Sequence, residues 1–363
     1  MLITRTLSCL CFCVVFFVAC KRTEQPITAT EAKALAEKIE KSVEDKDGKI
    51  LDELLDGEIF IDKIESYSGK KMNFSDKSGF KKTLKSIGFS REIIKPGQNG
   101  LPRYGLVKTY EKNKRMHLLF RLYGDEGINY HDFELVKMDG TIKAADLYIY
   151  LTGEDFSKTL ATLYNSFKDN SAIADSQSGT LTDIRQAISS GNPKQALSIY
   201  ENLSSELKKE KTVRLVYVQI CSQLDDEEVY NAAIDAYRTA FPDEANIGLV
   251  MMDGYINKKE YDKALAAVDQ IDSFINKDPF LDFFRGNINI LKGDNEQALV
   301  HFTKLHKAIP EYEDGFIKLI NIQMALEHKD EVEKLLTEYR ANRKLKRSSL
   351  DELFEAFPEY RSS

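Results

Sequence analysis

The chain has 363 residues, of which 42% are hydrophobic and 30% are charged. These proportions exclude a wholly disordered chain and a fibrous repeat, and the length predicts two or three domains. The formal net charge of −7 argues against a nucleic-acid-binding protein, because such proteins neutralise phosphates with an excess of lysine and arginine. Four of the five cysteines, Cys9, Cys11, Cys13 and Cys20, lie in the first twenty residues, which leaves Cys221 without a disulfide partner in the remainder.

The first twenty residues have the pattern of a secretion signal. Arg5 precedes an apolar run, residues 7–19, which is too short to cross a hydrocarbon core of about 30 Å. The run ends in Phe17-Val18-Ala19-Cys20, and these four residues resemble the signal of a bacterial lipoprotein, although Phe17 stands where leucine is usual. The resemblance implies cleavage before Cys20 and lipidation of its thiol.

A lipidated Cys20 would attach the chain to a membrane of the bacterial cell envelope. Two or more acyl chains give stable attachment, since one chain alone binds only marginally. Lys21, directly after the cysteine, favours the outer membrane of a diderm bacterium. The alternative is an ordinary secretion signal that happens to contain a cysteine. Residues 20–30 are in both cases a short polar tether.

Residues 31–170 are predicted to form an α+β domain. Helices are expected over residues 28–55, with a break at Asp47-Gly48, and over residues 77–87 and 154–167. Four strands are expected between the last two helices, near Arg103–Lys112, Arg115–Tyr123, Ile128–Met138 and Thr141–Leu151. Helices that pack on a four-stranded antiparallel sheet resemble, in element order alone, the nuclear-transport-factor-like cone fold.

The predicted hairpins bring two polar residues to the apolar face of this sheet. If Asp139-Gly140 is a two-residue turn, His131 and Asp146 are diagonal neighbours on the face that carries Phe133. The two residues could bind a ligand or carry out acid–base chemistry in a pocket of the α+β domain. The alternative is that they are a buried pair that hydrogen-bond each other and have only a structural role. The opposite face, with Arg115, His117, Arg121, Asp132, Glu134 and Lys143, is expected to be solvated.

The second half of the chain differs from the first in charge and in hydrophobic period. Residues 21–170 hold 26 basic and 25 acidic residues, whereas residues 171–363 hold 24 and 33. The small polar residues of 169–180 indicate a linker, so the two halves are treated as separate domains. Three segments of the second half align on Ala196, Ala264 and Ala298, which are 68 and 34 residues apart.

This 34-residue pattern resembles the tetratricopeptide repeat (TPR). Gly286, Ala298, Phe302 and Pro310 occupy the glycine, small, large apolar and terminal proline positions of the best copy. The resemblance covers residues 181–341 and implies about five helix pairs in an all-α superhelix, because a single pair cannot bury its apolar face alone. Residues 342–363 are expected to form a C-terminal capping helix and a tail.

One position of the predicted repeats carries short polar side chains that would line the inner groove. The residues, each 34 apart, are Arg185, Gln219, Asp253, Asn287 and Asn321. Such a row could hydrogen-bond an extended peptide, although groove residues of any unbound solenoid are polar because they are wet. The acidic charge of this half favours a neutral or basic protein segment as the partner.

Sequence motifs for an enzyme, a cofactor or a metal are not found. The glycines are scattered, and Cys11 and Cys13 leave with the signal. His301 and His306 are five residues apart, which is a poor spacing for binding one metal ion together. Cys221 lies in an apolar helix and is expected to be a core residue. We therefore expect a membrane-anchored binding scaffold without enzymatic activity or cofactor. A small-molecule-binding or hydrolytic or isomerase-type pocket is the alternative, and the absence of tryptophan weakens a third possibility, glycan handling.

Overall fold

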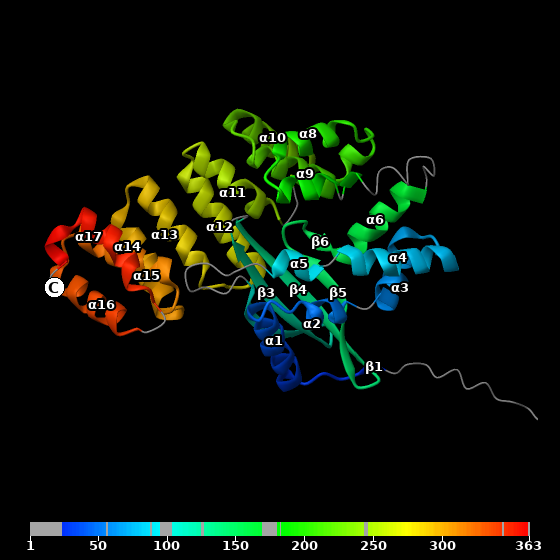
Figure 1. The fold of residues 1–363 in the computed structure, drawn as a ribbon, viewed down its shortest axis with the longest axis horizontal. Helices are drawn as coiled ribbons and strands as arrows, with labels where there is room; N and C mark the ends of the chain where they lie inside the picture. Colours follow the sequence, from blue (N-terminus) through cyan, green and yellow to red (C-terminus); the bar gives the residue numbers. More distant parts are fainter. Residues whose placement is uncertain are drawn as a thin grey trace, which may run out of the picture.

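The computed structural model describes residues 24–55, 57–87, 89–94, 104–124, 127–168, 180–181, 183–242, 246–342 and 345–361. The signal segment with Cys20 and nearly all of the predicted linker lie outside these residues. In the described part, helices and one antiparallel sheet come first and helices alone follow, so the predicted order of an α+β part and an all-α part is confirmed (Figure 1).

Five helices precede the main strands. Thr28 begins the first of them with a capping box, in which its hydroxyl accepts from the Glu31 amide and the Glu31 carboxylate accepts from the Thr28 amide. The break predicted at Asp47-Gly48 is present and spans residues 45–48. The bounds are α1 (Ala29–Glu44), α2 (Lys49–Leu54), α3 (Gly57–Ser68), α4 (Phe74–Ile87) and α5 (Phe89–Ile93). Helix α3 was not predicted.

The sheet has six strands, so the prediction of four strands is wrong. The four long strands lie close to the expected positions and pair in chain order: β2 (Tyr104–Lys112), β3 (Arg115–Gly124), β4 (Gly127–Met138) and β5 (Thr141–Ile149). Two short strands extend it. Strand β1 (Glu24–Gln25) pairs with β4, and β6 (Glu154–Asp155) pairs with β5 before helix α6 (Phe156–Lys168). Strands of two residues have no period that a sequence could reveal.

The β4–β5 hairpin changes register within its length. Met138 pairs with Thr141 and Leu135 with Ala144, as the Asp139-Gly140 turn requires, and Asp139 and Gly140 both have positive φ. A bulge then shifts the pairing, so that Glu134 faces Asp146. One extra residue moves every later side chain of β5 to the other face.

Both faces of the sheet are covered. Phe120, Phe133 and Leu135 pack in one core with helices α1, α3 and α6. On the opposite face, Leu119 and Tyr130 share a second core with helices of the all-α part. The sheet is therefore the middle layer that joins the two halves of the chain.

The second half is a succession of antiparallel helix pairs (Figure 1). Residues 183–189 are helical and precede the named helices. These are α8 (Pro193–Glu201), α9 (Lys211–Ser222), α10 (Glu227–Ala240), α11 (Ile247–Asn257), α12 (Tyr261–Ile275), α13 (Leu281–Lys292), α14 (Asn295–Ala308), α15 (Glu313–Ala325) and α16 (Lys329–Ala341). Short 3-10 turns at Leu207–Lys209, Arg347–Leu350 and Pro358–Tyr360 complete it.

The chain ends on the last helix pair. Helix α17 (Asp351–Ala356) buries Leu353 and Phe354 in the same core as α15 and α16. The Arg340 guanidinium lies over the Phe354 ring, 5.7 Å from its centre. Glu313, buried at the start of α15, accepts hydrogen bonds from the Tyr339 hydroxyl at 2.7 Å and the Lys346 amide at 3.1 Å. The end of the helix stack is covered.

Candidate functional site

The second helices of the pairs begin at one fixed interval. Their first residues are Pro193, Glu227, Tyr261, Asn295 and Lys329, each 34 residues after the last. The residues directly before three of them, Asn192, Asp226 and Asp294, cap their helices by accepting from the amide three positions on. The sequence thus ends each turn and starts each helix at the same point of a 34-residue unit.

The packing between paired helices follows the same interval. Ala196, Ala264 and Ala298 are fully buried, and so are the large apolar residues Val268 and Phe302, which come four residues after the last two. A side chain at Gly286 would place its Cβ 2.6 Å from the Phe302 ring, so helices α13 and α14 touch there through a glycine. The residues that define the repeat in the sequence are therefore contact points between helices.

The polar row lies on the first helix of successive pairs. Arg185 falls in the helical residues 183–189, and Gln219, Asp253, Asn287 and Asn321 fall on α9, α11, α13 and α15. All except Asn287 are exposed. Asn287 is half-buried, and its side-chain amide donates a hydrogen bond to the Phe283 carbonyl at 2.8 Å. One of its N–H groups is therefore already bonded within the helix. The row is thus a line of available polar groups interrupted at α13.

The predicted pair of His131 and Asp146 does not exist. His131 lies on the face with Phe133, as expected, but the bulge in β5 places Asp146 opposite Glu134 on the other face. The expectation followed from counting residues outward from the turn, and the count fails at the one residue that the bulge inserts.

His131 is a buried neutral histidine. Its Nδ1 lies 3.1 Å from the Tyr104 hydroxyl and its Nε2 lies 3.3 Å from the Asn129 amide nitrogen. Its ring is 5.4 Å from that of Phe89. Burial lowers the pKa of His131 to about 3, because a charged imidazolium would lose its hydration there. The ring is a packed and hydrogen-bonded part of the core.

Asp146 belongs to a charged cluster with Lys63 of helix α3. The Lys63 ammonium lies 3.0 Å from Asp146 and 3.1 Å from Glu134. The Ser157 hydroxyl donates a short hydrogen bond to Asp146. Burial alone would lower the pKa of Lys63, but the two carboxylates raise it above its usual value. This pairing holds α3 and α6 against the end of the sheet.

The sheet face that was expected to be solvated is an internal interface. His117, Arg121 and Asp132 are buried there, so that expectation is wrong for these residues. The Tyr110 hydroxyl donates to Asp132, and His117 Nδ1 lies 3.1 Å from the same carboxylate. The helices of the second half cover this network, which explains why polar residues alternate with tyrosines along these strands.

The turn between α12 and α13 makes several polar contacts with the sheet. Asp278 accepts from the Arg121 guanidinium at 2.8 Å and from the Tyr130 hydroxyl at 3.0 Å. The Arg121 guanidinium also lies over the ring of Phe280, 4.4 Å from its centre. Lys108 donates to the carbonyl of Ile275 at 2.6 Å, at the C-terminal end of α12, where a cation is favoured.

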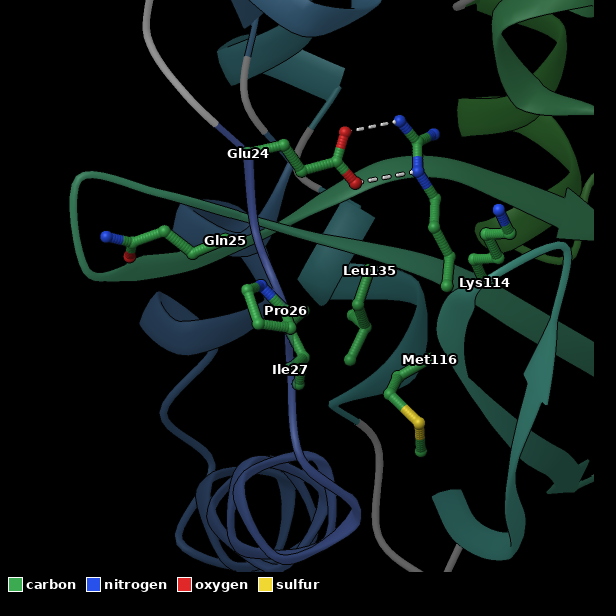
Figure 2. Close-up of a pocket in the computed structure, with 8 residues that line it drawn as sticks. Glu24, Gln25, Pro26, Ile27, Lys114, Met116 and Leu135 are labelled. Atoms are coloured by element: carbon green, nitrogen blue, oxygen red, sulfur yellow. Dashed lines mark hydrogen bonds and ion pairs between the residues drawn. The ribbon is translucent and has the colours of Figure 1, made fainter.

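Two shallow hollows mark the surface of the described residues. One has a volume of about 250 Å³ and lies beside strand β1. The Glu24 carboxylate accepts two hydrogen bonds from the Arg115 guanidinium, at 2.9 and 2.8 Å. Figure 2 shows Glu24 above the apolar side chains of Ile27, Met116 and Leu135. The other, about 450 Å³, lies at the α12–α13 turn, where Arg285 is held by Asp269, Asp272 and Asp282. Neither hollow is lined by His131, by Asp146 or by a residue of the polar row.

The remaining sequence candidates have ordinary structural roles. Cys221 is fully buried in α9, and burial raises the pKa of its thiol. His301 contacts Asp282 at 2.7 Å and His306 contacts Glu338 at 3.1 Å, so the two histidines have separate partners. Among the described residues no group of three or more potential ligands could hold a metal ion.

No helix within the described ranges is both long and apolar enough to span a bilayer. Comparison of the chain with protein-family models, with curated proteins and with solved structures gives no match. The polar row on the helix array is the candidate binding surface that the structure leaves open.

Proposed function

We propose that this chain is a lipid-anchored protein of the bacterial envelope whose TPR-like helix pairs bind a protein or peptide segment. The observation that carries the binding role is the fixed 34-residue interval of the second helices. Stacked pairs of this kind generate an extended surface, and their stability rests on neighbour contacts rather than on a closed core. Such a surface is suited to a long, thin partner.

The chemistry of the surface favours a neutral or basic partner. Gln219, Asn287 and Asn321 offer amide groups that match a peptide backbone, and Asp253 adds a negative charge. Residues 171–363 carry nine more acidic than basic residues, so an acidic segment would be repelled.

A binding role is proposed in preference to an enzymatic one. The pocket alternative depended on His131 and Asp146, and these residues lie on opposite faces of the sheet. His131 is enclosed by Tyr104, Asn129 and Phe89.

The anchor is tested by phase partitioning in detergent. The wild-type chain, expressed with its signal in a diderm bacterium, is expected to enter the detergent phase, and a Cys20→Ala chain is expected to stay in the aqueous phase. A Cys221→Ser chain is the control, because that thiol is buried and should not affect partitioning. If Cys20→Ala partitions like the wild type, the lipid is not on Cys20.

The surface is tested with charge-bearing substitutions in the full chain. Gln219→Arg and Asn321→Arg place a long side chain on exposed positions of the row, and Thr303→Arg does so on an exposed position of α14 outside the row. Partners are captured from detergent-solubilised envelopes and quantified by mass spectrometry. We expect the row variants to lose a partner that Thr303→Arg retains. Equal capture by all three chains would rule out the row as the binding surface.

A further inference from the structure

The most exposed large apolar side chain of the described residues stands at the start of helix α4. Phe74 is 90% exposed, whereas the next, Leu291, is 52% exposed. A phenylalanine that stays in water forgoes about 2 kcal/mol of burial free energy. Tyr67, at the end of α3, is also exposed on the same helical hairpin.

Lysines surround Phe74 in the sequence and on the hairpin. Residues 69–87 contain six lysines and one acidic residue, whereas the rest of residues 21–170 holds four more acidic than basic residues. Glu65 holds the ammonium groups of Lys71 at 2.6 Å and Lys77 at 2.9 Å, and the Lys71 side chain remains 88% exposed. Lys82 is also exposed. An exposed aromatic ring among lysines has the composition of an interfacial membrane contact.

The position of the hairpin relative to the tether supports this role. Figure 1 places α3, α4 and β1 toward the same end of the long axis, away from the C-terminal helices. Ion pairs connect them: Glu24 of β1 binds Arg115 at 2.8 Å, Arg115 binds Glu134, and Glu134 binds Lys63 of α3 at 3.1 Å. Cys20 is four residues before Glu24, a distance of at most about 14 Å along an extended chain.

We propose that the α3–α4 hairpin is a second membrane contact, in which Phe74 enters the interfacial region of an anionic bilayer and the lysines bind its headgroups. This inference rests on the proposed lipidation of Cys20, which supplies the first contact. The two contacts together place the end of the molecule that carries β1, α3 and α4 on the bilayer. The later helix pairs, with Asn321, then point away from the membrane.

The absence of tryptophan from the chain allows a direct test. The Phe74→Trp chain and a Leu291→Trp control, which places the probe on an exposed position of α13, each carry a single tryptophan, which can be excited selectively above the tyrosine absorption. The full lipidated chains are reconstituted into vesicles of phosphatidylglycerol and phosphatidylcholine that contain brominated lipid. We expect strong quenching and a blue shift for Phe74→Trp, and neither for Leu291→Trp.

Flotation of the same samples separates the two proposals. Chains that float with the vesicles while Phe74→Trp stays unquenched would overturn the hairpin contact and leave the anchor intact. Chains that do not float would overturn the anchor; quenching of the unlipidated chain by anionic vesicles would then still support the hairpin contact, and its absence would overturn both.

The electrostatic part is tested on the unlipidated chain. A Lys70→Gln/Lys82→Gln double variant is expected to bind anionic vesicles roughly twenty-five-fold more weakly, since each lysine near an anionic surface contributes a factor of roughly five. Equal affinities, or equal binding to vesicles of phosphatidylcholine alone, would contradict a role for the lysines.

Discussion

The Nη1 atom of Arg121 lies 2.8 Å from both carboxylate oxygens of Asp278, and less than a tenth of either side chain is exposed. Arg121 belongs to strand β3 and Asp278 to the turn between α12 and α13, 157 residues later. A buried ion pair of this kind is weak evidence for net stability, but the removal of one partner is costly because the other charge remains buried. The two halves of the chain are thereby coupled.

Removal of one member of this pair is expected to destabilise the whole chain. Asp278→Asn should lower the free energy of unfolding by about 3 kcal/mol, since the Arg121 guanidinium then stays buried beside a neutral amide. Urea unfolding of the full chain measures the change. Lys49→Met is the control, because it removes an exposed pair with Glu53 and should cost less than about 1 kcal/mol. Equal effects of the two substitutions would show that the buried Arg121–Asp278 pair matters no more than an exposed one.

Glycine is expected to be required at position 286. Gly286→Ala would bring a methyl group within 2.6 Å of the Phe302 ring, and the overpacking should destabilise the chain by about 1–3 kcal/mol. Gly79→Ala is the matched control in another helix, where the new Cβ meets no atom within 4 Å beyond the helix's own backbone and the adjacent residues. The control should gain about 0.5–1 kcal/mol from helix propensity. Thermal melts compare the two, and a stabilised Gly286→Ala chain would refute the close helix contact.

His131 is expected to make the protein less stable in mild acid. Its folded pKa is about 3 and its unfolded pKa is near 6.5, so the unfolded chain binds a proton between these values and the folded chain does not. Stability is fully present above about pH 6.5 and falls as the pH approaches 3. By about pH 4.5 the protonation of His131 in the unfolded chain should have removed about 3 kcal/mol of stability.

The contribution of His131 is isolated by comparison with His131→Gln, which retains a hydrogen-bonding side chain but does not titrate. The free energy of unfolding is measured against pH for both chains. The wild type should lose more stability than the variant between about pH 7 and pH 4.5. Parallel pH profiles would indicate that His131 can be protonated in the folded state.

Cys221 is expected to resist thiol reagents in the folded protein. The side chain is fully buried and its pKa is raised by burial, so both access and thiolate content are low. In the Cys20→Ala chain without its signal, a thiol reagent should react slowly in buffer and quickly in denaturant. Fast labelling in buffer would mean that α9 opens readily.

The sequence predicts the four long strands, the helix break at Asp47-Gly48 and the repeat interval, because each depends on local turn signals or on the period of apolar residues. It misplaces Asp146, because a bulge at Ala145 leaves no trace in the alternation of β5. It also predicts that the sheet face with Arg121 and Asp132 is solvated. The alternation of side chains shows that this face is polar, but it does not show that helices from a later part of the chain cover it. The tyrosines at positions 110, 130 and 148 were the signal that this face packs against something.

The candidate site was predictable only in part. The 34-residue spacing alone locates the polar row. The structure adds that the Asn287 side chain hydrogen-bonds the Phe283 carbonyl, whereas Gln219 and Asn321 remain exposed. The exposure of Phe74 could not be read from the sequence, because an apolar residue at the start of a helix is usually buried.

The binding role of the polar row is the central claim, and site-specific photo-crosslinking in living cells tests it most directly. A photoreactive amino acid at Gln219 or at Asn321, in the full anchored chain, should form adducts with the same partner. The same group at Thr303, outside the row, should not form that adduct. Adducts absent from both row positions, or equally abundant at Thr303, would contradict a binding role for this surface.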